Sequence, residues 1–326
     1  MLLYSKPYSP LQKKRPEDFG YRYFALKFQD DPVDLIVISK KGEEKLAKPL
    51  LFYCQDCQPQ PVIKYGEKGL LGTLPFDEKP FLEEFHIVVP GKPFIPIIAD
   101  TAILGPQYQY YKNRESALPP KAFLERNSLD YYVYRNNFIL KQLSKERWVK
   151  SRKLVVTGNA EGSSVAAKMA AVNKKVTHLI YSGGNPYGKI MNQLAQARYE
   201  EKDSLPQADR TIAYWKTVVA NSRTINLDGG DCYKTTYEFS LPQKENLMQL
   251  EIPVLFAYAT GDWSAAFNDL FQIETIREQK TNFQFRSYRS LEHGYYPVAG
   301  HHKPDYAQYN WEKVGRDWLE WLNTNT

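Results

Sequence analysis

The sequence lacks the features that mark membrane-spanning proteins and disulfide-rich secreted proteins. Its 326 residues include three cysteines, which are too few and odd in number for a disulfide framework. No apolar run reaches the length of about eighteen residues that a membrane-spanning helix needs. The N-terminal segment also has no apolar stretch of the signal-peptide type. We therefore expect no membrane span and favour the cytoplasm. A mature exported form whose leader has been removed stays open as an alternative.

The sequence also lacks a concentrated basic surface. The formal net charge is +6, but the 43 basic residues are spread along the chain among 37 acidic ones. The tight basic run is confined to residues 13–15, near the N-terminus. Nucleic-acid-binding proteins usually carry a basic face together with a recognisable motif. We therefore expect no nucleic-acid partner, while the oligomeric state cannot be read from these residues.

What the sequence does contain is an alternation of short apolar runs with helical patterns. Such alternation predicts a mainly parallel, doubly wound α/β sheet with helices on both faces. The expected strands are 21–29, 34–39, 50–54, 85–89, 153–157, 176–181, 252–259 and 283–288, and the expected helices are 129–143, 161–172, 265–279 and 310–322. Residues 186–250 are polar, helical and rich in tyrosine, which predicts a helical cap inserted between two strands. The core would then comprise residues 1–185 and 251–326.

The segment Lys153 to Ala171, KLVVTGNAEGSSVAAKMAA, predicts a strand, a sharp turn and a helix of small residues. Gly158 and Gly162 lie two residues before and two residues after Ala160. In a nucleophile elbow these two positions must be small, because the strained turn leaves no room for side chains. The N-terminus of the helix would also direct backbone N–H groups at a ligand above residue 160. The segment thus has the layout of a nucleophile elbow with alanine in the position of the nucleophile.

An acid and a histidine follow later strands in the order that this layout requires. Asp262 follows the expected strand 252–259, at a carboxyl end, where catalytic side chains of open α/β sheets gather. His293 lies in the segment LEHGYY after the last expected strand. The order along the chain is nucleophile position, acid, histidine.

In their joint order and spacing, these segments resemble the α/β-hydrolase superfamily, and most of all its dienelactone-hydrolase and prolyl-oligopeptidase-like branch. The resemblance covers about residues 45–326. It implies a serine hydrolase of esters or small amides that needs no metal and no organic cofactor. Asp262 would orient His293, which would act as general base toward residue 160 and later as general acid. The backbone N–H groups of Glu161 and Cys57 would form the oxyanion hole.

The remaining expected site residues surround this centre. Asp56 departs from the family pattern, which usually has glycine nearby, so its carboxylate would either point outward or bind a cationic part of a substrate. The residues that we expect to contact a small ester or amide substrate are Gln55, Asp56, Tyr187, Tyr233 and Trp263.

Alanine at position 160 has two explanations, because its methyl group cannot attack a carbonyl. One is an engineered replacement of serine, and the other is a natural pseudo-hydrolase that binds a ligand in a sensing or regulatory role without cutting it. We favour the first, because the flanking glycines, Asp262 and His293 are intact. Ser164 also lies between small residues, but it falls inside the expected helix rather than at its tip.

Three rival interpretations depend on short motifs. The turn VVTGNAEGSS is similar to a dinucleotide-binding turn. In dinucleotide-binding proteins, however, that turn follows the first strand, whereas several expected strands precede it in this chain. Cys54 and Cys57 form a C-x-x-C pair, but the prolines that follow disfavour the helix of a redox site. His301, His302 and Asp305 are close in sequence, although three such residues in a proline-bearing loop are weak evidence of a metal.

Overall fold

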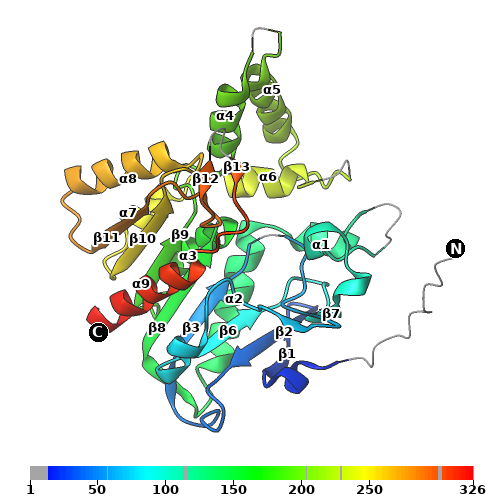
Figure 1. Ribbon diagram of the computed structural model, residues 1–326, viewed down its shortest axis with the longest axis vertical. Coiled ribbons are helices and arrows are strands. Elements are labelled where there is room, and N and C mark those ends of the chain that lie inside the picture. The colour runs from blue at the N-terminus through cyan, green and yellow to red at the C-terminus, as the bar shows by residue number, and fades with distance from the viewer. Residues whose placement is uncertain are drawn as a thin grey trace, which may run out of the picture.

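The computed structural model describes residues 14–56, 58–112, 117–202, 204–227, 230–299 and 303–325. Within these residues, an eight-stranded sheet forms the centre of the protein, in the order β1-β2-β6-β3-β8-β9-β10-β11 (Figure 1). In sheet order, the strands are β1 Arg22–Phe28, β2 Asp31–Ile38, β6 His86–Pro90, β3 Lys48–Cys54, β8 Val149–Asn159, β9 His178–Ser182, β10 Val254–Ala259 and β11 Phe283–Tyr288.

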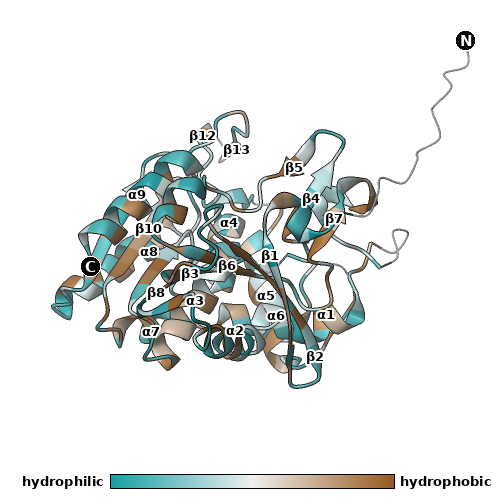
Figure 2. Ribbon diagram, turned by 90° about the horizontal axis from the view of Figure 1, so that it is seen from below, coloured by the Kyte–Doolittle hydropathy of each residue, from teal (hydrophilic) through white to brown (hydrophobic). Residues whose placement is uncertain are grey.

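The sheet is mainly parallel. Neighbouring strands from β6 to β11 pair in parallel, whereas β1 pairs antiparallel to β2, and β2 antiparallel to β6. Every residue of β10 is buried, while exposure alternates along the edge strand β1. Central parallel strands are covered on both faces, so they read as continuous apolar runs such as VLFAYA. Figure 2 shows the hydrophobic residues concentrated in these central strands.

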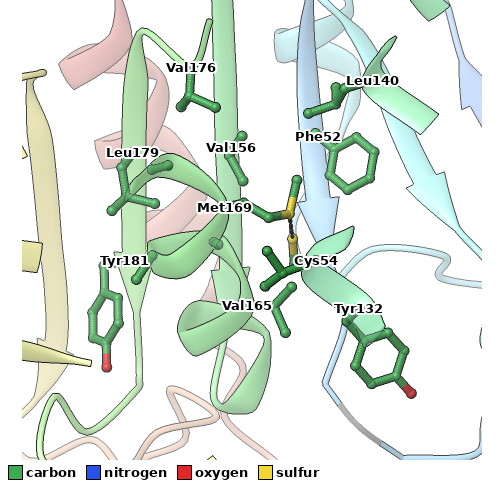
Figure 3. Close-up of a cluster of buried hydrophobic side chains, with 14 of the residues drawn as sticks. Phe52, Cys54, Tyr132, Leu140, Val156, Val165, Met169, Val176, Leu179 and Tyr181 are labelled. Carbon is green, nitrogen blue, oxygen red and sulfur yellow. Dashed lines mark hydrogen bonds between the residues drawn. The ribbon is translucent and has the colours of Figure 1, made fainter. Parts of the chain in front are cut away.

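Helices cover the two faces of the sheet. On one face, α2 (Leu129–Leu143) and α3 (Glu161–Val172) pack on the strands together with α8 (Ala265–Arg277). Figure 3 shows this packing around α3, where Val165 and Met169 lie in one cluster with Phe52 and Cys54 of β3, and Cys54 Sγ lies 3.6 Å from Met169 Sδ. On the other face, α9 (Trp311–Thr324) buries its tryptophans against the same sheet. The small residues of α3 let its backbone approach the sheet closely, which places its first turn above the ends of the strands.

Among the described residues, four helices lie between β9 and β10 in the chain. They are α4 Lys189–Glu200, α5 Gln207–Ala220, α6 Tyr233–Ser240 and α7 Lys244–Met248. The helices α4, α5 and α6 contact one another, and Figure 1 shows α4 and α5 standing above the sheet. The short helix α7 instead contacts α3 of the core. The division of the chain into a core and a cap at residues 186–250 stays a prediction.

The sequence did not predict the smaller elements. A second sheet joins β5 (Gly69–Leu71), β4 (Ile63–Gly66) and β7 (Ile98–Asp100). The hairpin β12–β13, the helix α1 and four short 3-10 helices were missed as well. Their bounds are β12 Val298–Ala299, β13 Lys303–Pro304, α1 Lys121–Arg126, Pro16–Phe19, Lys79–Glu83, Thr101–Ile103 and Pro106–Tyr108. No helix among the described residues has the length and apolar character needed to cross a membrane.

Candidate active site

Ala160 occupies the turn between β8 and α3 with an unusual backbone conformation. Its φ of 51° and ψ of −126° lie in a region that residues other than glycine seldom adopt. Its N–H donates to the carbonyl of Ser182 at 3.1 Å, and its own carbonyl accepts from the hydroxyl of Ser163 at 2.6 Å. These bonds hold the Cβ of residue 160 at the tip of a rigid turn.

The two glycines beside this turn are required by close backbone contacts. A Cβ at Gly158 would lie 2.2 Å from the carbonyl oxygen of Gly162. A Cβ at Gly162 would lie 2.2 Å from the carbonyl oxygen of Cys54 on β3. The prediction that positions 158 and 162 leave no room for a side chain is thus confirmed.

Gly162→Ala is expected to lower the free energy of unfolding by about 2 kcal/mol, because the new methyl group must displace the backbone of β3. Urea denaturation of the variant and the parent chain measures this difference. Gly72→Ala is a matched control, since a Cβ there would lie at an ordinary contact distance of 3.4 Å from its nearest neighbour. Equal stability of the two variants would contradict the crowded elbow.

Asp262 and His293 form a hydrogen-bonded pair. His293 Nδ1 lies 3.0 Å from Asp262 Oδ1. The other oxygen of Asp262 accepts from the Ser264 backbone N–H at 2.9 Å and from the Ser264 hydroxyl. Burial alone would raise the pKa of Asp262, but the hydrogen bonds from His293 and Ser264 hold it below its usual value. The carboxylate therefore stays ionised and fixes the orientation of the imidazole ring.

A second carboxylate, which the sequence analysis did not identify, also faces this histidine. Glu292 Oε2 lies 3.2 Å from His293 Nδ1, and Glu292 Oε1 accepts from the backbone N–H of Tyr296 at 3.1 Å. Partial removal of the imidazole from water would by itself lower the pKa of His293. The hydrogen bond to Asp262 and the negative charges of Asp262, Glu292 and Asp56 outweigh this effect and raise the pKa to about 9. The imidazole side chain nevertheless keeps 53% of its surface exposed.

Asn159 connects the histidine loop to the elbow. Its Nδ2 donates to the carbonyl of His293 at 3.3 Å, and its Oδ1 accepts from the hydroxyl of Ser182 at 2.9 Å. Asn159 directly precedes Ala160, so a single side chain links the elbow, the end of β9 and the loop that carries His293. This side chain fixes the histidine loop relative to residue 160.

A chain of charged groups runs from the loop after β3 to the inserted helices. Lys189 Nζ, in the first turn of α4, lies 2.7 Å from Glu161 Oε1 and 2.5 Å from Asp231 Oδ2. Glu161 in turn shares a hydrogen bond with Asp56. Burial would raise the pKa of Glu161, but Lys189 and the bond from Asp56 lower it. Asp56 keeps part of its surface exposed to solvent, but its carboxyl group is surrounded by many protein atoms. This partial removal from water and the negative charge of Glu161 raise the pKa of Asp56.

Two cavities lie close to this centre. The first, here called the elbow cavity, has a volume of about 220 Å³ and is lined by Ala160, Glu161, Asp262, Trp263, His293 and residues of α4, among others. The second, here called the tyrosine cavity, has a volume of about 470 Å³. It borders the elbow at Asp56, Asn159 and Gly294. Among the described residues no residue lines both cavities, but Asn159 and Gly294 of the tyrosine cavity are the chain neighbours of Ala160 and His293, which line the elbow cavity.

Not all expected substrate contacts come to these cavities. Gln55 and Asp56 line the tyrosine cavity. Tyr187 instead packs against Phe267 of α8, and Tyr233 packs against Tyr214 of α5, so neither is among the described residues that line the two cavities. These two assignments depended on the tyrosine content of residues 186–250, which does not distinguish packing from substrate contact.

Several other predicted residues have a different outcome. Cys57, His301 and His302 lie outside the described residues. Cys54 is buried at the end of β3, where burial raises the pKa of its thiol to about 12. Ser164 borders the elbow cavity, but it lies in the first turn of α3 rather than at the tip of the elbow.

No protein-family model and no curated protein sequence matches the chain. Solved structures do match it. Acylaminoacyl peptidase from Pyrococcus horikoshii superposes with a TM-score of 0.54 at 13% identity, over 94% of this chain and 41% of that chain. Est1E from Butyrivibrio proteoclasticus, with ferulic acid bound, has a TM-score of 0.56 at 12% identity, over 93% of this chain and 98% of its own.

A third similar structure is 2,6-dihydroxy-pseudo-oxynicotine hydrolase, with a TM-score of 0.53 at 15% identity, over 94% of this chain and 68% of that one. This chain therefore spans less than half the length of the peptidase and about two thirds of the length of this hydrolase. At such identities the likeness shows the fold alone. The protein has the α/β-hydrolase fold that its sequence predicted, with helices α4 to α7 inserted before the strand that precedes Asp262.

Proposed function

We propose that this protein is a hydrolase of esters or small amides whose nucleophile position, residue 160, holds alanine in place of serine. The strained backbone of Ala160 supports this proposal most directly. Backbone strain of this kind costs of order 1–3 kcal/mol and persists where it serves a site. At residue 160 it would serve a nucleophile beside the pair of Asp262 and His293, and an alanine methyl group makes no use of it.

With serine at position 160, the chemistry follows from the positions of the side chains. The serine hydroxyl would attack the substrate carbonyl while His293 takes the hydroxyl proton, and Asp262 would stabilise the imidazolium that forms. Backbone N–H groups, one of them from Glu161, would hold the oxyanion of the tetrahedral intermediate. His293 would then return the proton to the leaving group. A water molecule activated by the same histidine would finally release the acyl group.

The similar solved structures support the broad class of this reaction. Two of the three bear the names of hydrolytic enzymes, a peptidase and a hydrolase. The inference from those proteins to this chain concerns bond hydrolysis and not their particular substrates.

A natural pseudo-hydrolase is the second candidate, and the acid pair at the elbow favours it. The carboxylate of Glu161 accepts a hydrogen bond from its own backbone N–H, the group that would serve the oxyanion. Asp56 lies against the same carboxylate. A carboxylate that competes for this donor would weaken the stabilisation of a developing oxyanion. Such a protein would bind its ligand in the elbow cavity without cleaving it.

A fluorophosphonate probe, which reacts with activated serines, distinguishes the two candidates. The chain with Ala160 should remain unlabelled, and Ala160→Ser should become labelled. Adding His293→Ala to Ala160→Ser should abolish the labelling, because the hydroxyl then has no base. If Ala160→Ser folds, binds small ligands and resists the probe, the pseudo-hydrolase is the correct assignment.

The hydrolytic activity of Ala160→Ser is expected to rise with pH until it reaches a plateau above about pH 9. The general base must be neutral, and the raised pKa of His293 keeps the imidazole protonated up to about that pH. The pH profile of kcat/KM measures this ionisation in the free enzyme. Glu292→Gln removes one of the charges that raise the pKa, so it should move the profile to lower pH. An unchanged profile would exclude Glu292 as a cause.

A further inference from the structure

The tyrosine cavity has a composition unlike the elbow cavity. Its wall combines aromatic rings with side-chain amides, and its volume of about 470 Å³ lies within the range of small-molecule sites. The lining aromatic residues are Tyr53, Tyr108, Tyr296, Tyr309 and Trp311, and the lining amides are Gln55, Gln58, Gln60 and Asn159. Tyr108 and Tyr309 are about half exposed, whereas Tyr53 and Trp311 are buried, so Tyr108 and Tyr309 present more aromatic surface to a ligand than those two residues.

The three glutamines of this wall are each fixed at one end. Gln55 Nε2 donates to the carbonyl of Pro90 at 2.6 Å, and Gln60 Nε2 donates to the carbonyl of Gln107 at 2.7 Å. Gln58 Oε1 accepts from Gln109 Nε2 at 2.7 Å. Among the described residues, no hydrogen bond reaches the opposite end of any of these amides. The wall thus offers ordered carbonyl and NH₂ groups, and a ligand hydroxyl can pair with both because it donates and accepts.

The charges of the wall favour a neutral ligand. Among the described residues that line the cavity, Lys64 is the single basic one, and burial lowers its pKa. Asp56 is the single acidic one within the same described set, and its pKa is raised. A phosphate or carboxylate site would instead present arginines or several basic groups. A site for a long acyl chain would have fewer fixed amides, because each would remain unpaired against hydrocarbon.

We propose that the tyrosine cavity is a binding subsite for a neutral carbohydrate, whose ring packs on the tyrosine faces while its hydroxyls pair with the glutamine amides. Because this cavity borders the elbow at Asp56, Asn159 and Gly294, the sugar would be the alcohol part of an ester whose acyl group lies in the elbow cavity. This second statement depends on the proposed hydrolase function, whereas sugar binding itself does not.

Binding can be measured on the chain as it is, because the sugars used carry no ester bond that the protein could cleave. Isothermal titration calorimetry with methyl β-glucoside, xylobiose and cellobiose should give saturable binding, with a Kd below about 10 mM for at least one sugar. Tyr108→Ala should weaken that binding by about threefold to tenfold through the lost ring contact. Tyr134→Ala is the matched control, since Tyr134 is an exposed tyrosine of α2 outside this cavity, and it should leave the affinity unchanged. Gln60→Ala should also weaken binding.

Three results would overturn the subsite. The first is that none of these sugars binds. The second is that a sugar binds but neither Tyr108→Ala nor Gln60→Ala weakens the binding. The third is that p-nitrophenol binds to the protein instead of the sugars. Hydrolysis of p-nitrophenyl acetate by Ala160→Ser separates the two proposals. If that ester is cleaved and no sugar binds, the subsite fails alone. If sugars bind and the ester is not cleaved, the hydrolase proposal fails and the sugar site stands.

Discussion

Ala160→Ser is expected to raise the rate of hydrolysis of p-nitrophenyl acetate by at least about a thousandfold over the present chain. The substitution adds one oxygen to a Cβ that the strained backbone already holds at the wall of the elbow cavity. Asp262 already fixes the imidazole of His293. A complete nucleophile, base and acid act as a unit, so restoring the missing member should recover most of their joint effect. Steady-state kinetics on the purified protein measures the gain.

Two further variants make this result specific. His293→Ala in the Ala160→Ser chain should return the rate nearly to that of the present chain. Ser164→Ala in the same chain should leave the rate unchanged, because Ser164 lies inside α3 and is not proposed to react. If activity instead depends on Ser164, the nucleophile has been misplaced by one helical turn. If Ala160→Ser stays inactive while the fold is intact, the acid pair of Asp56 and Glu161 becomes the next target for substitution.

The parts of the fold that the sequence predicted well are those with strong local signals. The helix expected at 129–143 has those bounds in the structure, as does the strand at 283–288. The predicted elbow could be located because its glycines, small residues and buried strand are adjacent in the chain. The second strand was expected to begin at residue 34, but β2 begins at Asp31 and includes Pro32, so the turn after β1 comes earlier in the chain than expected. Proline is tolerated there because it lies near the beginning of the strand.

The parts that the sequence did not predict depend on contacts between distant segments. Lys189 and Asp231 are ordinary polar residues in their local context, and the fold brings Lys189 to both Glu161 and Asp231. The strands β4, β5 and β7 have three or four residues each, which is too short for a clear alternation. The position of Glu292 next to His293 in the sequence was a signal that the two side chains could interact. Adjacent residues often point in different directions, however, so adjacency alone did not predict that the Glu292 carboxylate faces the imidazole ring.

Lys189→Met is expected to lower the free energy of unfolding by about 3 kcal/mol at neutral pH. The methionine keeps most of the apolar stem but leaves the carboxylates of Glu161 and Asp231 without their shared cation. All three side chains are mostly buried, so water replaces the lost charge poorly. Lys189 lowers the pKa of Glu161, so its stabilisation is present above the unfolded-state pKa of Glu, near 4.3, and is lost as the pH falls toward the folded-state value. Urea denaturation at pH 7 and at pH 3 measures both effects.

Lys168→Met provides the matched control, because Lys168 of α3 pairs with Asp130 on a more exposed part of the surface. That change should cost less than about 1 kcal/mol. Glu161→Gln added to Lys189→Met should recover part of the lost stability, since it removes one of the two uncompensated charges. Equal losses for Lys189→Met and Lys168→Met would show that solvent screens the Lys189 pairs. A larger loss for Lys189→Met that shrinks at pH 3 would show that this ion chain holds α4 and the segment before α6 against the elbow, so that the inserted helices and the nucleophile position are stabilised together.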